Sequence, residues 1–507
     1  KFFRNMKKMT PAMKVTDIKN GICAVISEND QNSLVDQIKS ASEAGADLIE
    51  LRIDFLKSNY NLKTILESCD LPCLVTIRRK KDGGEWSGPE DQRIGLLQQA
   101  CDLGAAAVDI EEDVFNKVSK SSKTIRILSY HNFNETPGNL EDLFRRFRDL
   151  NPDMIKIACK SNTFQDWLNL FKLYKLNGPK KILFGMGTKG FPSRILSLQE
   201  GAPWMYATHS LNQPNAPGIP TLNKIKRLYA LKTLSEKTKI YGVVGDPISQ
   251  SISPDIHNIA FRHAGFDGIY LPFHVSKSEY KVFLDQLPNI RLEGLSVTIP
   301  HKEETAARSS TKSTMVQGIG AANTLIHSQN GYHAENTDAL AIVSALKHQL
   351  GNDLPNIPVL ILGAGGAGRA GAYALKKEGC DVVITNRSHE RSENLAKEMS
   401  LKTIPWEDRH RFSKGILLQC TSLGMHPNPN ESAWNEKCFT PEHIAFDTVY
   451  NPLETKFLLD AKKASAKTIP GIEMFVHQAA AQFYFFTGLN APLDIIRETA
   501  LSALRDK

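Results

Sequence analysis

The chain has 507 residues, which at roughly 100–200 residues per domain suggests about three domains. Hydrophobic residues make up 41% and charged residues 23%, as in ordinary globular proteins, and no apolar run approaches the roughly 20 residues of a membrane span. The 62 Lys and Arg exceed the 55 Asp and Glu by only seven, and they are dispersed rather than clustered. We therefore expect neither a membrane nor a nucleic acid as partner.

The eight cysteines are scattered, and Cys69 and Cys73 form the only close pair. No cysteine or histidine spacing typical of a metal site occurs, so we predict reduced thiols and no metal. Residues 1–20 begin with a basic, Met-containing stretch that lacks the apolar core of a signal peptide. We interpret this stretch as a disordered leader, or as the remnant of a cleaved targeting peptide. The expected compartment is the cytoplasm, or a plastid in the second case.

Short apolar runs alternate with helical patterns between residues 21 and 222. Continuous apolar strands separated by helices indicate a parallel sheet that is covered on its outside. Eight such units predict an α/β fold of the (β/α)₈ or TIM-barrel type, with an open doubly wound sheet as the alternative. The predicted strands are residues 22–27, 47–53, 73–78, 106–111, 124–130, 154–158, 181–187 and 204–208.

Polar side chains gather where the predicted barrel strands end, which is where barrel enzymes place their chemistry. Glu50 and Arg52 end the second strand, Arg78 ends the third, and His131 follows the fifth. Lys156 lies inside the sixth strand between apolar neighbours, so we expect it to be buried. A buried lysine without a partner must lose its proton or bind something. The uncharged amine is the nucleophile that Schiff-base chemistry requires.

Five segments of this half resemble, in order, the type I 3-dehydroquinate dehydratases. They are residues 47–55 (DLIELRIDF), 108–111 (VDIE), 129–133 (SYHNF), 156–158 (KIA) and 185–187 (GMG). The resemblance implies that Lys156 forms an imine with the C3 ketone of 3-dehydroquinate. His131 would remove the C2 proton and then protonate the departing C1 hydroxyl, because a histidine with an ordinary pKa of about 6.5 exists in both forms at neutral pH. The product would be 3-dehydroshikimate.

The same resemblance assigns the substrate contacts. Arg194 matches the family's clamp for the carboxylate, Met186 would pack on the ring, and the ring hydroxyls would bind Glu50, Arg52 and Arg78. Asp82 stands where the family has a glutamate that contacts the catalytic histidine, here His131.

Two further departures concern the lid and the last strand. The lid, residues 216–219, reads Ala-Pro-Gly-Ile and lacks the usual side-chain amide, and His209 replaces a usual phenylalanine. A weak or non-catalytic barrel is therefore an open alternative.

After a predicted helix and linker at residues 223–239, the clearest motif is the glycine-rich run of residues 363–368. It follows the apolar strand 359–362 and opens the helix 369–377, which is the arrangement of a dinucleotide-binding Rossmann domain. Backbone N–H groups at the helix N-terminus would bind the pyrophosphate. The residues predicted to form this loop are Gly363, Gly365, Gly366, Ala367 and Gly368.

The cofactor preference is predicted from the end of the next strand, residues 381–385. NAD enzymes usually carry Asp or Glu there to bind the ribose hydroxyls, whereas this chain has Asn386 and Arg387. Because Arg387 would pair with a 2′-phosphate, we predict NADP(H) rather than NAD.

Ordered segments across residues 240–507 resemble the shikimate dehydrogenases. They are residues 241–254, 296–302, 320–324, 335–338, 421–425, 447–452 and 471–478. The resemblance implies reduction of 3-dehydroshikimate to shikimate by NADPH, with Lys302 and Asp338 as the acid–base pair. It assigns Ser251 and Ser253 to the substrate carboxylate, although both hydroxyls could simply cap a helix. Other residues would bind the substrate (Thr298, Asn323, Tyr450, Gln478) or the cofactor (Thr421, Ser422, Met425).

The predicted second half thus has two lobes. Residues 240–338 with 470–507 would form the substrate domain, and residues 339–469 the NADP-binding domain. The first reaction supplies the substrate of the second, which gives the fusion a metabolic logic. Two alternatives remain open: a dehydrogenase that uses quinate and NAD, and a regulatory module that only senses pathway intermediates. The oligomeric state is predicted as monomer or homodimer.

Overall fold

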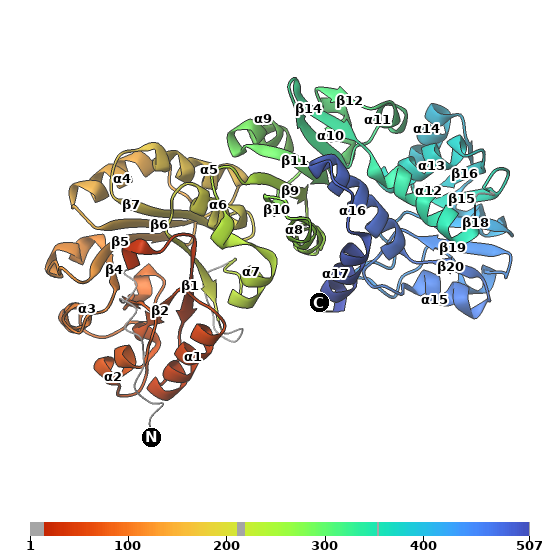
Figure 1. The fold of residues 1–507 in the computed structure, drawn as a ribbon. Helices are drawn as coiled ribbons and strands as arrows, with labels where there is room; N and C mark the ends of the chain where they lie inside the picture. Colours follow the sequence, from red (N-terminus) through yellow and green to blue (C-terminus); the bar gives the residue numbers. More distant parts are fainter. Residues whose placement is uncertain (1–14, 210–217, 352–353, 506–507) are drawn as a thin grey trace. The chain divides into compact units, whose positions relative to one another are not determined.

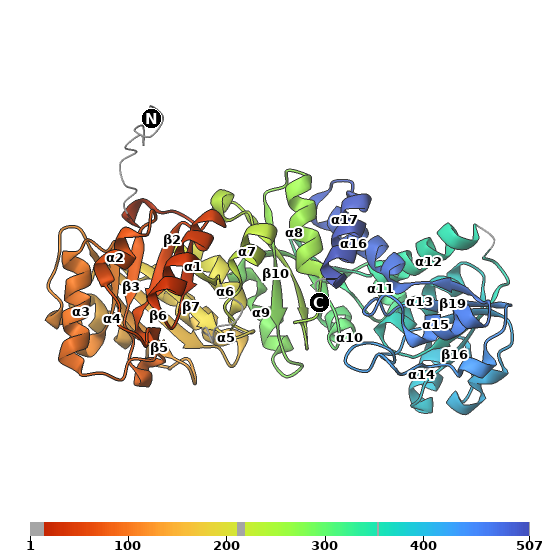
Figure 2. The same cartoon turned by 90° about the horizontal axis from the view of Figure 1, so that it is seen from below.

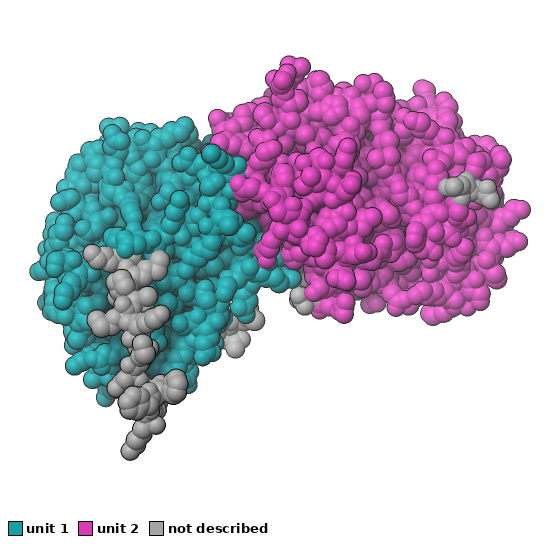
Figure 3. Space-filling model, in the orientation of Figure 1, with its two compact units in different colours: residues 1–238 teal, residues 239–507 magenta. Residues whose placement is uncertain are grey.

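The computed structural model describes residues 15–209, 218–351 and 354–505. The chain divides into two compact units, residues 1–238 and 239–507, which are coloured teal and magenta in Figure 3. No helix in the described ranges is long and apolar enough to cross a lipid bilayer.

The first unit is built on one parallel sheet of eight strands in the order β7-β6-β5-β4-β3-β2-β1-β8. Phe184 of β7 and Tyr206 of β8 are in ring contact, with centroids 6.2 Å apart, so side chains of the two terminal strands meet. This arrangement confirms the predicted (β/α)₈ barrel. Its strands are β1 (Gly21–Ile26), β2 (Leu48–Arg52), β3 (Cys73–Thr76), β4 (Ala107–Glu111), β5 (Ile125–Asn132), β6 (Met154–Lys160), β7 (Lys180–Met186) and β8 (Trp204–Thr208).

Helices cover the outside of this sheet (Figures 1 and 2), and their buried residues are mostly apolar, as the alternating pattern predicted, although Arg93 and Arg194 are buried as well. One connection differs, because β4 is joined to β5 by the 3₁₀ helix η4 (Glu112–Lys117) in place of an α-helix. The α-helices are α1 (Gln31–Glu43), α2 (Leu62–Glu67), α3 (Glu90–Asp102), α4 (Leu140–Asp149), α5 (Phe164–Lys172), α6 (Phe191–Gln199) and α7 (Leu222–Leu228).

Of the predicted leader, residues 1–20, the structure describes residues 15–20. Val15 and Ile18 are buried, and the Asn20 side-chain amide donates to the carbonyl of Leu234 at 2.7 Å. Residues 15–20 are therefore packed against the barrel, and the interpretation of this part as disordered is wrong. Residues 1–14 lie outside the described residues.

The second unit contains two six-stranded sheets, of which the first is mixed. Its order is β10-β9-β11-β13-β14-β12, with antiparallel pairing of β13 to both β11 and β14. The strands are β9 (Lys239–Gly245), β10 (Gly268–His274), β11 (Leu292–Val297), β12 (Thr311–Lys312), β13 (Thr324–Ser328) and β14 (Gly331–Glu335). The helices that follow these strands are α8 (Ser253–His263), α9 (Tyr280–Ile290), α10 (Lys302–Arg308), α11 (Thr314–Ile319) and α12 (Thr337–Leu350).

The second sheet of this unit is parallel, in the order β17-β16-β15-β18-β19-β20. Counted along the chain this order is 3-2-1-4-5-6, which is that of the dinucleotide-binding Rossmann fold and confirms the predicted domain type. Its strands are β15 (Pro358–Leu362), β16 (Asp381–Thr385), β17 (Lys402–Thr403), β18 (Gly415–Gln419), β19 (His443–Asp447) and β20 (Lys467–Ile469). The helices are α13 (Gly366–Lys377), α14 (His389–Met399) and α15 (Lys456–Lys463).

The chain then returns to the mixed sheet through α16 (Gly471–Thr487) and α17 (Leu493–Arg505). Both helices lie beside α8 (Figures 1 and 2), and Phe261 of α8 shares one buried apolar cluster with Phe483 and Ile496. The cavity described below therefore takes residues from the beginning and the end of this unit.

Candidate active sites

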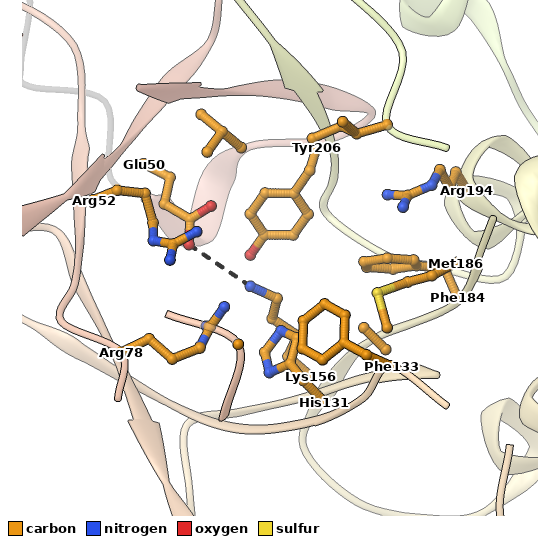
Figure 4. A pocket seen from close by; sticks show the side chains of 14 residues that line it. Glu50, Arg52, Arg78, His131, Phe133, Lys156, Phe184, Met186, Arg194 and Tyr206 are labelled. Atoms are coloured by element: carbon orange, nitrogen blue, oxygen red, sulfur yellow. Dashed lines mark ion pairs between the residues drawn. The ribbon is translucent and has the colours of Figure 1, made fainter. Parts of the chain in front are cut away.

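A cavity of about 140 Å³ lies at the C-terminal ends of the barrel strands. Figure 4 shows the amine of Lys156 pointing into it, with Arg194 on one side and Arg52 and Arg78 on the other. A pocket of this layout has a cation at each end and a nucleophile between them. Its lining is Val25, Glu50, Arg52, Arg78, Gly83, His131, Phe133, Lys156, Ala158, Phe184, Met186, Arg194, Tyr206 and Ile219.

Lys156 is buried, as predicted, but it has partners. Its Nζ lies 3.1 Å from Asp109 Oδ2 and 3.8 Å from Glu50 Oε1, and 4.2 Å from the ring centroid of Tyr206. Lys156 therefore binds a carboxylate, which is one of the two outcomes expected for a buried lysine, although Asp109 was not predicted as its partner.

Asp109 connects Lys156 to the rest of the site. Its Oδ1 accepts hydrogen bonds from an Arg78 Nη at 2.7 Å and from Ser129 Oγ at 2.6 Å, and its side chain is fully buried. Burial alone would raise the pKa of Asp109, but the cations of Arg78 and Lys156 outweigh burial and hold this pKa well below its usual range. Asp109 is therefore a permanent negative charge behind the cavity.

Burial, together with the cations of Arg78 and Lys156, lowers the pKa of His131 well below its usual range, and Asp109 only partly opposes this effect. The expectation that His131 keeps its ordinary pKa is therefore wrong. The imidazole, whose ring lies 6.2 Å from that of Phe133, is a base in the resting site. Once protonated, it is a stronger acid than a histidine in water.

The cations at the two ends of the cavity are held differently. Arg52 donates to both carboxylate oxygens of Asp54, at 3.0 and 2.7 Å. Arg194, in the second turn of α6, lies over the ring of Phe184 at 4.5 Å, and burial lowers its pKa to about 9. A buried cation against an aromatic ring gains strongly from an incoming anion, so Arg194 suits a substrate carboxylate.

The structure does not bring Asp82 to the other predicted residues. Its carboxylate accepts from Arg79 Nε at 2.6 Å, and it does not line the cavity, although its neighbour Gly83 does. Arg79 and Asp82 form this ion pair because both belong to one turn of 3₁₀ helix. His209 likewise faces elsewhere, with its Nε2 at 2.9 Å from Ser40 Oγ.

Of the predicted lid, Ala216 and Pro217 lie outside the described residues. Ile219 lines the cavity and presents an apolar side chain there.

Sequence reasoning missed several residues of this site. Asp109 lies in the quoted segment 108–111, where alternation along β4 places Asp109 and Glu111 on one face, yet neither had a role. Three aromatic rings that line the cavity were also missed: Phe133, Phe184 and Tyr206.

A larger cavity of about 360 Å³ lies in the second unit. It contains twelve of the residues predicted for the second reaction, from both the mixed and the parallel sheet. They are Ser251, Ser253, Thr298, Lys302, Asn323, Asp338, Ala367, Thr421, Ser422, Met425, Tyr450 and Gln478. Ser251 Oγ also accepts from the backbone N–H of Ser253 at 3.3 Å, so it supports the start of α8 as well.

The predicted acid–base pair is formed. Lys302 Nζ lies 2.5 Å from Asp338 Oδ2, and Asn323 Nδ2 donates to Asp338 Oδ1 at 2.9 Å. Gln482, which sequence reasoning missed, donates to the carbonyl of Asn323 at 3.0 Å and accepts from Ser296 Oγ at 2.9 Å. This hydrogen-bond network fixes the carboxylate that holds Lys302.

The glycine-rich loop fits a dinucleotide. Gly363 has φ +114°, and a Cβ at Gly368 would lie 2.0 Å from the carbonyl oxygen of Gly363, so both positions require glycine. Gly365 faces open space at the N-terminus of α13, where a pyrophosphate would bind. A Cβ at Gly366 would lie 2.9 Å from Lys302 Cδ, so this loop touches the acid–base lysine.

The two residues after β16 lie at the predicted adenosine end. Asn386 Oδ1 accepts from the backbone N–H of Ala364 at 3.2 Å and so fixes the glycine-rich loop. Arg387 is exposed, with its side chain accessible to a ligand. Within the described residues, no group of three or more His, Cys, Asp or Glu is arranged to hold a metal ion.

Fold and sites define two fused enzyme modules, a lysine-centred barrel and a two-lobed dinucleotide-dependent reductase. Residues 22–236 match the family model of type I 3-dehydroquinase. Residues 243–325 match the shikimate dehydrogenase substrate-binding domain, 345–414 the shikimate/quinate 5-dehydrogenase family, and 471–501 the shikimate 5′-dehydrogenase C-terminal domain.

The chain is 34% identical to the chloroplastic bifunctional 3-dehydroquinate dehydratase/shikimate dehydrogenase of Arabidopsis thaliana, over 94% of this chain and 83% of the relative. It belongs to this bifunctional family. The NADP⁺-dependent shikimate dehydrogenase of Methanosarcina acetivorans is 35% identical over 53% of this chain and 99% of its own length. A crystal structure of a shikimate dehydrogenase with NADP⁺ superposes with a TM-score of 0.51 at 31% identity, covering 54% of this chain and 98% of that one.

One buried carboxyl beside the second cavity has an unusual pKa. Asp447, which ends β19, accepts from the backbone N–H of Val449 at 2.9 Å and from Thr455 Oγ1 at 2.6 Å. Burial raises its pKa from 3.8 to about 7. Because residues 448–451 line the cavity, this carboxyl anchors one of its walls.

The raised pKa predicts how stability changes with pH. The stabilising contribution of the protonated Asp447 is complete below its unfolded pKa of about 4 and is lost as the pH rises through about 7. The side chain in Asp447→Asn stays neutral at every pH. When the pH rises from about 5 to about 8, the unfolding free energy of the wild type should therefore fall by roughly 1–3 kcal/mol more than that of the variant. Urea unfolding at both pH values measures this, with the exposed Asp381→Asn as control. Equal pH dependence of wild type and Asp447→Asn would contradict the assignment.

Proposed function

We propose that this protein dehydrates 3-dehydroquinate to 3-dehydroshikimate in the barrel and reduces that product to shikimate with NADPH in the second unit. The observation that carries the proposal is the buried Lys156 amine beside His131, placed between Arg194 and the pair Arg52 and Arg78. Such a pocket suits a ring that bears a carboxylate at one end and hydroxyls at the other.

The barrel reaction begins with capture of the C3 ketone by Lys156. The ammonium first gives up one proton, the neutral amine attacks the ketone carbon, and the proton returns to the oxygen that leaves as water. The product is a protonated imine, so the positive charge is again on the lysine nitrogen. This iminium draws electrons from C2 and acidifies its proton, which neutral His131 removes. The resulting enamine expels the C1 hydroxyl, which leaves as water with the proton from His131. One water then hydrolyses the conjugated imine, which releases 3-dehydroshikimate and regenerates Lys156. The low pKa of His131 suits both steps, because it is a free base at rest and a strong acid once protonated.

The second reaction uses the pair Lys302 and Asp338. NADPH supplies a hydride to C3 of 3-dehydroshikimate when it is bound. Lys302, held by Asp338 at 2.5 Å, lies in the cavity where it can stabilise the developing alkoxide and deliver a proton to it. Ser251 and Ser253 would bind the substrate carboxylate, and Thr298, Asn323 and Gln478 the ring hydroxyls. Tyr450 would complete this pocket.

The residues of the glycine-rich loop, with Thr421, Ser422 and Met425, would hold the cofactor. The second unit matches a family that includes quinate dehydrogenases, so quinate with NAD is the competing pair of ligands for this site. Comparing shikimate with quinate, each with NADP⁺ and with NAD⁺, distinguishes the two.

Ile219 favours one alternative for the barrel, a weak dehydratase. Ile219 lines the cavity at the position where the family usually has a side-chain amide. The substrate therefore has one hydrogen-bond partner fewer at this position. Appearance of the conjugated enone product from dehydroquinate measures this activity directly. The compartment, whether cytoplasm or plastid, and the monomeric or dimeric state stay predictions.

Borohydride with 3-dehydroquinate should fix a covalent adduct on Lys156, because reduction traps the imine. Peptide mass spectrometry locates the adduct. Lys156→Ala should form none and lose at least about 100-fold in dehydration rate, while shikimate oxidation by the same protein stays near the wild-type rate and shows that the second unit is intact. An adduct on another lysine would overturn the barrel assignment.

Lys302→Ala should lower the rate of 3-dehydroshikimate reduction by about 100-fold or more, because the alkoxide loses its stabilising cation. The dehydration rate of this variant should be unchanged, since Lys302 does not belong to the barrel. Separate assays of the two reactions on one preparation measure both rates. Parallel loss of both activities would refute two independent sites.

Arg387→Ala should raise the Michaelis constant for NADPH by about tenfold, the equivalent of one lost charge-assisted contact, and leave that for NADH nearly unchanged. Steady-state assays with each cofactor test this. Arg411→Ala, at an exposed arginine of the same lobe, is the matched control. A proportional rise for both cofactors would mean that Arg387 does not recognise the 2′-phosphate.

A further inference from the structure

Asp109 takes no part in the proposed dehydration steps, although it touches the reacting nitrogen. Its Oδ2 lies 3.1 Å from Lys156 Nζ, and its side chain is fully buried behind the cavity that the substrate would occupy. Its other oxygen is held by Arg78 and Ser129. A carboxylate fixed by three partners keeps its position when substrate enters.

The charge on the lysine nitrogen changes during the proposed barrel reaction, on which this inference rests. The nitrogen is positive as the ammonium, positive as the iminium and neutral as the enamine. When the iminium becomes the enamine, a C2–H bond breaks, its proton moves to His131, and its electron pair forms the C2–C3 double bond. The positive charge thus moves from Lys156 to His131. An uncompensated charge in so dry a site would be costly at either position.

We propose that Asp109 is a catalytic residue, the counter-ion of the iminium that keeps the imine nitrogen protonated and remains close to the charge when it moves to His131. The geometry places it against Lys156, and its electrostatic effect on His131 favours the protonated imidazole. One fixed carboxylate therefore stabilises both charged states, and proton transfer from C2 requires no rearrangement of the site.

Glu50 is less suited to this role. Its Oε1 lies farther away, at 3.8 Å from Lys156 Nζ, and accepts a hydrogen bond from Thr76 Oγ1 at 2.7 Å. Glu50 also lines the cavity, where it would bind substrate hydroxyls. Glu111 lies two residues after Asp109 on β4, but its carboxylate accepts from Arg93 at 2.7 Å, with Arg78 at 3.8 Å. Glu111→Gln is therefore a matched control for removal of a buried charge.

The test combines turnover with two reductants. Asp109→Asn should lower the dehydration kcat by about 100-fold or more, while Glu111→Gln should change it by less than about tenfold. Borohydride reduces both the imine and the iminium, whereas cyanoborohydride reduces the iminium selectively. The wild type should give equal Lys156 adduct with both reagents. Asp109→Asn should give adduct with borohydride and much less with cyanoborohydride.

The outcomes are distinct. Asp109→Asn with near wild-type turnover, or with equal trapping by both reagents, would overturn the role of Asp109 and leave the proposed function intact. No adduct on Lys156 in the wild type would overturn the proposed function itself. A thermal melt reports on folding of the barrel in the variant, and shikimate oxidation shows that the second unit is intact. If Asp109→Asn does not fold, the wild type alone tests the proposal. Its yield of cyanoborohydride adduct should persist to about pH 9, and a fall of this yield near neutral pH would refute the counter-ion role of Asp109.

Discussion

The barrel site depends on the pairing of Lys156 with Asp109, two opposite charges in a place from which water is nearly excluded. Once a lysine is buried there, every further charge needs a partner. Asp109 binds Arg78, Arg78 approaches Glu111, and Glu111 binds Arg93. Arg93 pairs with Glu90, which binds Arg79 near the surface. The catalytic amine is thus the inner end of a chain of alternating charges that reaches solvent.

The second unit holds its reactive lysine by different means. Among the residues that the structure describes, Lys302 pairs with one carboxylate, that of Asp338. Neutral Asn323 donates to this carboxylate, and Gln482 donates to the carbonyl of Asn323. Gln482 lies on α16, far along the chain from Lys302, so one of the last helices supports the segment of Asn323, which in turn contacts Asp338. The cavity of the second unit is wider, at about 360 Å³ against about 140 Å³ in the barrel, and residues from both sheets of that unit line it.

Local pattern was sufficient to predict both folds, because parallel strands that are buried on both faces read as apolar runs. Lys302, Asn323 and Asp338 were identified by the resemblance to the shikimate dehydrogenases, and the structure brings all three to one cavity. Pairing between distant segments was not predictable in this way. Lys156 and Asp109 are 47 positions apart, so the sequence pattern did not identify Asp109 as the partner of the lysine. Asp82 was predicted to contact His131, but in the structure its carboxylate binds Arg79, three residues earlier in the chain.

The contact between Gly366 and Lys302 links nucleotide recognition to proton delivery. A phosphate-binding loop is usually treated as a cradle that could be exchanged between dehydrogenases. Here one of its residues must lack a side chain so that the stem of the acid–base lysine can pass beside it. Grafting a loop from another reductase into this protein would therefore alter the chemistry as well as the cofactor affinity, and cofactor swaps by loop exchange should be designed around position 366.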